Sequence, residues 1–200
     1  VVDEFEDAYL VFESMNSQGL DLSATDLLKN RLLHKAGPSN TDNLVTTWKE
    51  FIASLDQCRF TAVECAWYFW SGVRVDPGNG PSRKRLYHDI RENIDAEDKA
   101  IELASELKEA GKQLAEWTSR GLPFRNHGDQ LHCPFAQLET LKYKSVYQNL
   151  YRLRHKSDEN PDLLNWFAAV SARFLVRNVS ICKRKGVVEN LDRKIAKAID

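Results

Sequence analysis

Hydrophobic residues along this chain recur every three or four positions, which is the spacing of amphipathic helices. The clearest stripes predict helices over residues 44–55, 62–73, 86–94, 96–117, 146–153 and 163–181. In the last of these, Phe167, Val170 and Phe174 are expected to point inward. No alternation typical of strands follows the first five residues. The sequence therefore predicts an all-α fold, an irregular multi-helix bundle of about eight to ten helices.

The opening of the chain contains two short amphipathic segments that meet at a closely specified turn. Gly19 can take the left-handed conformation that ends a helix, and the Asn16 amide can satisfy backbone groups there. Ser23 is expected to cap the second helix, with Asp26 at its third position as in a capping box. We therefore divide the chain into a signature helix pair at 1–36 and a helical domain at 37–200.

Further along the chain, turn and cap residues separate the predicted helices. The Gly-Pro-Ser-Asn segment at 37–40 predicts a stop and a turn, after which Thr41 is expected to cap the next helix. Thr61 and Glu64 form a capping box before the helix at 62–73. Pro161 stands where a first helical residue is expected, a position that proline favours.

Four aromatic residues follow one another at 67–70, with the sequence Trp-Tyr-Phe-Trp. A platform for stacking bases or a partner groove is one interpretation. The other is a helix buried on most sides in the centre of a bundle. Stacking platforms usually carry interleaved basic residues, and none lies among these four. The pattern therefore favours the buried helix.

Composition is ordinary for a soluble globular chain, but the charge is unevenly distributed. The formal net charge of −1 combines +7 on residues 142–200, from 13 Lys and Arg against 6 Asp and Glu, with −8 on the remainder. Such asymmetry is typical of a nucleic-acid face, although long helices also carry solvated basic faces. The residues that we expect to contact a DNA backbone are Arg173, Arg177, Lys183, Arg184, Lys185, Arg193, Lys194 and Lys197.

Motifs of common catalytic sites do not occur in the sequence. There is no nucleophile elbow, HExxH helix, Walker loop or EF-hand loop. His127, His132 and Cys133 lie close together in sequence, but their spacing matches no common zinc arrangement. The four cysteines form no Cys-x-x-Cys pair, which is typical of free thiols in a reducing compartment, and no apolar run is long enough to span a membrane. We therefore expect no catalytic residue, metal site or cofactor in this chain, and a cytoplasmic location.

A family pattern lies within the signature helix pair. Its residues are Phe12, Glu13, Asn16, Gly19, Leu22, Ser23, Asp26, Leu27, Leu28, Lys29 and Asn30. This pattern resembles the signature of the GmrSD-type restriction family, catalogued as domain-of-unknown-function family 262. In that family the signature follows a ParB/sulfiredoxin-like nucleotide domain with an Asp-Gly-Gln-Gln-Arg motif, a helical region comes next, and many members end in a His-Asn-His nuclease domain.

Neither the Asp-Gly-Gln-Gln-Arg motif nor a His-Asn-His motif occurs in these 200 residues. The resemblance therefore implies that the chain is the helical middle of a larger protein, with residues 1–36 either ending the nucleotide domain or beginning the helical region. It also implies GTP or ATP as a cofactor of the parent protein. Lys29 and Asn30 are candidates for facing that nucleotide. Capping explains the other polar signature residues without a ligand, namely Asn16, Gly19, Ser23 and Asp26.

Two functions follow from the sequence. The resemblance implies a scaffold or coupling region of a nucleotide-dependent, modification-dependent restriction or phage-defence protein, whose partners are its flanking domains and DNA. The parent would be an NTP-dependent nuclease, and this fragment would not itself catalyse the reaction. The alternative is a stand-alone helical module that binds a protein partner and has no DNA role.

Overall fold

The computed structural model describes residues 24–56, 58, 60–75, 86–118, 138, 146–156, 161–175, 177, 194, 197 and 198. Within these ranges the chain forms six helices and no strand, which confirms the expected all-α class there. The helices are α2 (Ala24–Leu55), α3 (Ala62–Val73), α4 (Leu86–Asn93), α5 (Glu97–Thr118), α7 (Val146–Lys156) and α8 (Pro161–Leu175). The total of about eight to ten helices depends also on the other segments and stays a prediction.

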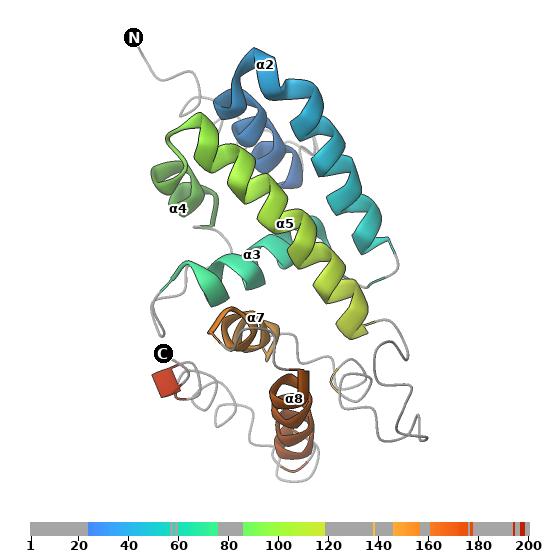
Figure 1. The fold of residues 1–200 in the computed structure, drawn as a ribbon. Coiled ribbons are helices and arrows are strands. Elements are labelled where there is room, and N and C mark those ends of the chain that lie inside the picture. The colour runs from blue at the N-terminus through green and yellow to red at the C-terminus, as the bar shows by residue number, and fades with distance from the viewer. Residues whose placement is uncertain are drawn as a thin grey trace, which may run out of the picture.

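Two bent helical units lie against each other and form the upper part of the molecule (Figure 1). The first is α2, which kinks at Gly37, and the second is α4 followed by α5. The two bends lie at the same end, where the Asn40 side chain donates a hydrogen bond to Glu97. Further along, Lys108 pairs with Glu50 at 3.1 Å, so that the second half of α2 runs parallel to α5.

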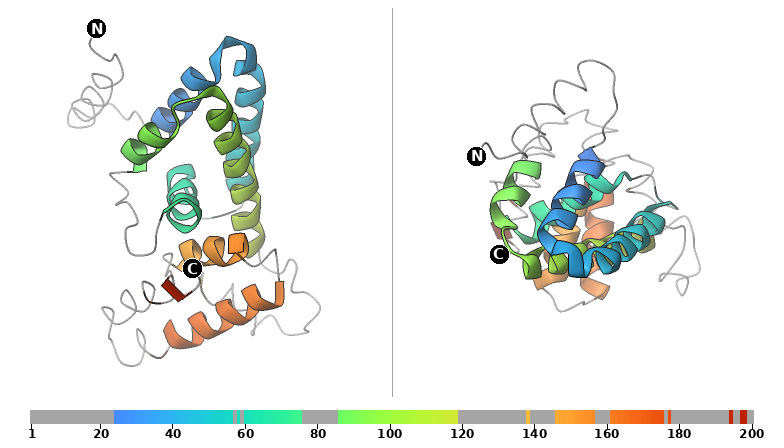
Figure 2. Two further views of the ribbon diagram at one scale, coloured as in Figure 1. Left: turned by 60° about the vertical axis from the view of Figure 1, so that its left-hand side comes forward. Right: turned by 90° about the horizontal axis from the view of Figure 1, so that it is seen from above.

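The bent units leave a space between their arms, and α3 fills it. Figure 2 shows α3 nearly end-on between the arm formed by α4 with the first half of α2 and the arm formed by α5 with the second half. Helix α7 closes the open side of this arrangement, and α8 packs on α7. The order of layers is therefore the bent pair with α3 inside it, then α7, then α8.

Helix α3 carries the predicted aromatic run and is covered on every side. Eight of its twelve residues are buried and none is exposed. Its capping box forms as predicted, since the Thr61 hydroxyl accepts a hydrogen bond from the Glu64 amide and the Glu64 carboxylate accepts one from the Thr61 amide. The interpretation of residues 67–70 as a buried helix is confirmed: Tyr68, Phe69 and Trp70 are buried in the core, and the half-buried Trp67 packs against it.

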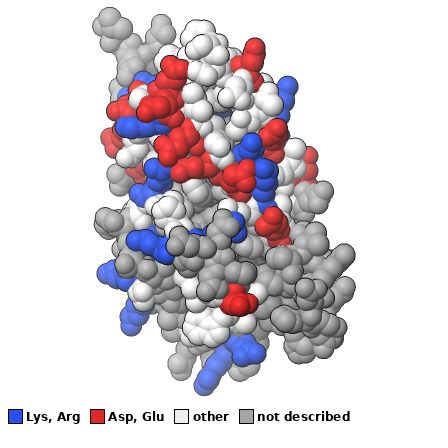
Figure 3. All heavy atoms as spheres, viewed as in Figure 1, with Lys and Arg blue, Asp and Glu red and all other residues white. Residues whose placement is uncertain are grey.

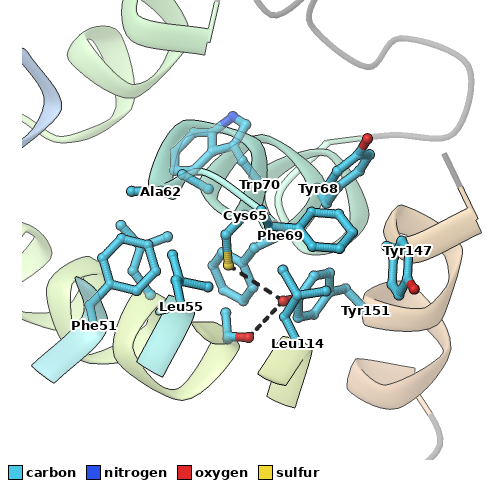
Figure 4. Packing of buried hydrophobic residues seen from close by; sticks show 14 of the residues in the cluster. Phe51, Leu55, Ala62, Cys65, Tyr68, Phe69, Trp70, Leu114, Tyr147 and Tyr151 are labelled. Carbon is cyan, nitrogen blue, oxygen red and sulfur yellow. Dashed lines mark hydrogen bonds between the residues drawn. The ribbon is translucent and has the colours of Figure 1, made fainter. Parts of the chain in front are cut away.

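Tyr147 and Tyr151 of α7 lie beside the aromatic residues of α3 (Figure 4), and both rings also contact Trp117 of α5. The Tyr147 ring meets Phe60 edge-on, with ring centroids 5.0 Å apart, and stacks on Trp117 at 6.4 Å. Tyr151 lies one turn further along α7, with its ring 5.8 Å from Phe69 and 4.9 Å from Trp117. Aromatic pairs at these separations contribute about 0.5–1.5 kcal/mol each beyond the burial of their surface.

Two expectations for individual residues are wrong. Thr41 does not cap a helix: the helix resumes at Pro38, a residue suited to the first helical position, and the Thr41 hydroxyl donates a hydrogen bond to the Gly37 carbonyl at 3.0 Å. A single glycine with φ of 71° therefore makes the turn. Val170 does not point inward, since 42% of it is exposed. The buried face of α8 instead runs through Leu164, Phe167, Ala168, Ala172 and Leu175.

Glycine allows close contact at the crossing of α3 and α7. A Cβ atom on Gly72 would overlap the carbonyl oxygen of Gln148 and lie 3.0 Å from the Cβ of Tyr151. Both obstacles belong to the backbone or to the base of a side chain, so that they cannot rotate away. The separation of these two helices is therefore set by the absence of a side chain at residue 72.

We expect Gly72→Ala to lower the free energy of unfolding by about 1–3 kcal/mol, because the added methyl group forces α3 and α7 apart. The loss should occur although alanine favours a helix over glycine by about 1 kcal/mol. Urea unfolding followed by circular dichroism measures it, with the exposed helical substitution Ser105→Ala as the control. A Gly72→Ala variant as stable as the wild type would contradict the close crossing.

Candidate functional site

The first half of α2 presents one polar face and one buried face. Asp26 and Asn30 are exposed and Lys29 is half-buried, and their spacing of three and four residues places them on the same side of the helix. Leu28 and Leu32 on the other side are buried in the core. The structure thus brings together the three described signature residues with polar side chains. Outside the described residues lie the signature positions Glu13, Asn16, Gly19 and Ser23.

Lys29 and Asn30 lie where a ligand-facing role requires them, on the accessible side of the helix. Asp26 lies in the first turn of α2, where a carboxylate stabilises the positive end of the helix dipole. Helix α2 begins at Ala24, so that its start agrees with the position expected for a cap at Ser23. Capping by Ser23 itself stays a prediction, as does any ligand of Lys29 and Asn30.

Arg31 extends from the buried side of this helix to the end of α4. Its Nη2 donates hydrogen bonds to the carbonyl oxygens of Arg91 at 3.0 Å and Ile94 at 3.2 Å. The last carbonyl groups of a helix have no partner within the helix and carry its partial negative charge. The guanidinium satisfies both requirements, and it fixes α4 to the first half of α2.

Arg152 makes the same kind of contact at the end of α3. Only 4% of this residue is exposed. Its Nη2 donates hydrogen bonds to the carbonyl oxygens of Ser71 at 2.9 Å and Val75 at 2.7 Å. Arg152 is one of the 13 basic residues of the chain's last third, yet it serves the interior and is inaccessible to DNA. Sequence reasoning missed both arginine contacts, although each arginine stands among apolar residues of a buried helix face, which is a usable signal.

The described members of the predicted basic face are accessible. Arg173, Arg177, Lys194 and Lys197 are all exposed. Arg173 lies in the last turn of α8, and Arg177 follows the end of that helix. The structure therefore brings two of the predicted arginines to one end of α8. The other four members lie outside the described residues, namely Lys183, Arg184, Lys185 and Arg193.

Two apolar side chains on α8 adjoin this basic end, and sequence reasoning did not identify them as surface residues. Trp166 is 62% exposed and Val170 is 42% exposed. Counted from Trp166, Val170 is four residues and Arg173 seven residues further along, the spacing of one helix face. A large exposed indole is unusual on a helix whose other face is already packed. The spacing of 166, 170 and 173 was the available signal.

Charge is unevenly distributed over the face of the described residues that Figure 3 shows. Acidic side chains gather over α2, α4 and α5, whereas basic side chains predominate at the end formed by α7 and α8 (Figure 3). The last turn of α7 contributes Arg154, His155 and Lys156, which also lie favourably at the negative end of the helix dipole. Near α5, exposed lysines pair with carboxylates, as Lys99 does with Asp95 and Lys112 with Glu109, both at 2.7 Å.

The buried thiol of Cys65 is unsuited to nucleophilic chemistry. Tyr151 donates its hydroxyl hydrogen to the Ala110 carbonyl at 2.6 Å, and the Cys65 sulfur lies 3.6 Å from the same hydroxyl oxygen (Figure 4). Burial raises the pKa of Cys65 to about 12, although the contact with Tyr151 acts in the opposite direction. A thiol with this pKa is protonated at neutral pH, and only a thiolate is strongly nucleophilic. The Cys65–Tyr151–Ala110 contacts therefore join α3, α7 and α5 as part of the core.

The described residues contain neither a candidate metal site nor a candidate membrane-spanning helix. Those residues contain no cluster of three or more His, Cys, Asp or Glu side chains that could hold a metal ion. None of their helices combines the length and the apolar character needed to cross a bilayer. Among the residues that the sequence singled out, the accessible polar groups that the structure describes lie on the signature face of α2 and at the basic end of α8.

Comparisons of this chain with protein-family models, with curated proteins and with solved structures found no match.

We expect Arg152→Ala and Arg31→Ala each to lower the free energy of unfolding by about 1–3 kcal/mol, because each leaves buried helix-end carbonyls without their charged donor. Thermal and urea unfolding measure the loss. The exposed substitution Arg173→Ala is the matched control and should change stability by less than about 0.5 kcal/mol. Equal stabilities for Arg152→Ala and Arg173→Ala would contradict the structural role of the buried arginine.

Proposed function

We propose that this chain is the helical scaffold of a larger nucleotide-dependent, modification-dependent restriction or phage-defence protein, and that it contacts DNA through the basic end of α8. The family resemblance of the signature helix supports the first part. The exposure of Arg173 and Arg177 supports the second and is the observation on which the proposal chiefly rests. The chain itself needs no catalytic group for this role, and the nuclease reaction belongs to the parent protein.

The arrangement of the helices suits a coupling region. The signature face with Lys29 and Asn30 belongs to the arm of α2 and α4, whereas α8 lies at the opposite end of the layered helices (Figure 2). Between them, α3 and α7 are closely packed at Gly72 and joined by Arg152. A nucleotide domain preceding the signature helix and DNA at α8 would therefore be held at a fixed separation.

Binding to DNA through this surface would be electrostatic and independent of sequence. The described residues supply arginine side chains, which match phosphate geometry, at the end of a helix rather than a recognition helix with several base-reading side chains. With the further lysines and arginines of residues 183–193, about four phosphate contacts are expected. We propose that the protein acts in the cytoplasm. We also propose that the complete chain forms a bundle of about eight to ten helices.

A second function is favoured by the exposed apolar side chains of α8. Trp166 and Val170 would suit the centre of a protein interface, where tryptophan and arginine often supply most of the binding energy. In that case the chain would be a helical interaction module without a DNA role. The two functions differ in whether charge at Arg173 and Arg177 controls binding to DNA.

For duplex DNA followed by fluorescence anisotropy, we expect log affinity to fall with log salt at a slope of about −3.6, as four phosphate contacts imply. The double variant Arg173→Ala/Arg177→Ala should reduce the magnitude of this slope by about 1.8, because it removes two of those contacts. The matched control is Lys99→Ala/Lys112→Ala, which also removes two exposed positive charges but from side chains already paired with carboxylates.

The control should keep the wild-type slope. Equal binding by the wild type and the α8 double variant would contradict the DNA contact at α8, as would absence of binding at low salt. Salt-independent binding of a protein partner, abolished by Trp166→Ala, would instead favour the interaction module.

A further inference from the structure

We propose that the α8 stripe, defined as Trp166, Val170 and Arg173, binds the unpaired bases of single-stranded DNA. This inference rests on the proposed function of DNA contact and specifies the form of DNA that the surface selects. Charge in the sequence points only to the basic residues, whereas the structure adds an exposed indole beside them.

The geometry of the stripe places an aromatic surface and a cation on one side of the helix. From Trp166 to Val170 and from Trp166 to Arg173 the helical rotation is close to one and two full turns. The rise over those seven residues is about 10.5 Å. Because the arginine side chain is flexible, its guanidinium can lie closer to the indole than this rise. The indole and the guanidinium can therefore contact neighbouring parts of one extended strand.

Exposure of Trp166 is the feature that points to a stacking ligand. The buried face of α8 already packs through Leu164, Phe167 and Ala168, so Trp166 is not needed for attachment to the bundle. With 62% of its surface exposed, the indole offers a face on which a base can stack. Stacking of this kind contributes about 1–3 kcal/mol per base and tolerates any base, since every base has an aromatic face.

A single strand fits this surface better than a duplex does. In a duplex the faces of the bases are stacked on one another, and only their edges are accessible in the grooves. An indole fixed on a helix surface cannot stack on such bases unless they leave the helix. In a single strand the bases are free to stack on Trp166 while Arg173 contacts a phosphate.

Charge favours a nucleic acid over an apolar protein groove at this position. Arg173 and Arg177 stand at the C-terminal end of the stripe and are both exposed. Asp162, four residues before Trp166, is the one carboxylate on the described part of α8. A polyanion is therefore expected to lie over the C-terminal half of the helix, with its bases toward Trp166 and Val170.

The experiment compares an oligothymidine with a duplex of equal length, each labelled for fluorescence anisotropy, and uses the 200-residue chain at low salt. We expect Trp166→Ala to weaken binding of the single strand about tenfold and to change duplex affinity less than about twofold. Trp166→Phe should retain part of the single-strand affinity, because phenylalanine keeps an aromatic face. The neighbouring substitution Asn165→Ala, off the stripe, is the matched control, and circular dichroism verifies that each variant is folded.

The outcomes separate this inference from the proposed function. If Trp166→Ala leaves single-strand binding unchanged while Arg173→Ala/Arg177→Ala still weakens duplex binding, the stacking inference fails and the DNA contact stands. If neither form of DNA binds, both fail. If Trp166→Ala converts an associated chain into a monomer without affecting DNA binding, the stripe is a contact between copies of the chain, and the stacking inference is overturned.

Discussion

The need to cover α3 on all sides determines most of this structure. Its sequence, AVECAWYFWSGV, contains one side chain that is charged at neutral pH, namely Glu64, which the capping box uses. Helices with a polar side can rest on a core, but a helix that is apolar all round must lie inside one. One wall is formed by α4 with the first half of α2, a second by α5 with the second half of α2, and a third by α7 (Figure 2). Burial of Tyr68, Phe69 and Trp70 alone contributes several kcal/mol of hydrophobic free energy.

Burying helices in this core leaves carbonyl groups at helix ends in need of hydrogen-bond donors, and two arginines supply them. The end of α3 exposes carbonyl groups to a water-poor interior, and Arg152 of α7 satisfies two of the carbonyls there. Arg31 does the same for α4, so that both helix ends are fixed by a side chain from a neighbouring helix. The signature face on α2 and the basic end of α8 are both accessible, and they lie at opposite ends of these packed helices. A scaffold that keeps a nucleotide domain and DNA apart would have this division.

Sequence periodicity predicted the described helices well, because their buried stripes are long and regular. Residue type and charge predicted the buried aromatic helix, the capping box at Thr61 and the accessibility of Arg173 and Arg177. Periodicity is less informative elsewhere. It failed where the outcome depends on a neighbour that periodicity does not specify. Val170 fits an apolar stripe, yet Ala168 and Ala172 are buried whereas Val170 is exposed. The sequence does not distinguish Arg152 from a surface cation, because its role depends on the end of α3, which lies beside it in the fold.

Native-state hydrogen exchange of the backbone amides tests most directly whether the fold depends on burying α3. If it does, the amides of α3 exchange only when the whole chain unfolds, with the same free energy and denaturant dependence as the slowest amides of α5 and α7. Amides of α8, which packs on one face only, are expected to exchange through smaller openings. Exchange of α3 at a distinctly lower free energy than α5 would contradict the account, because α3 could then be exposed while the helices around it stay folded.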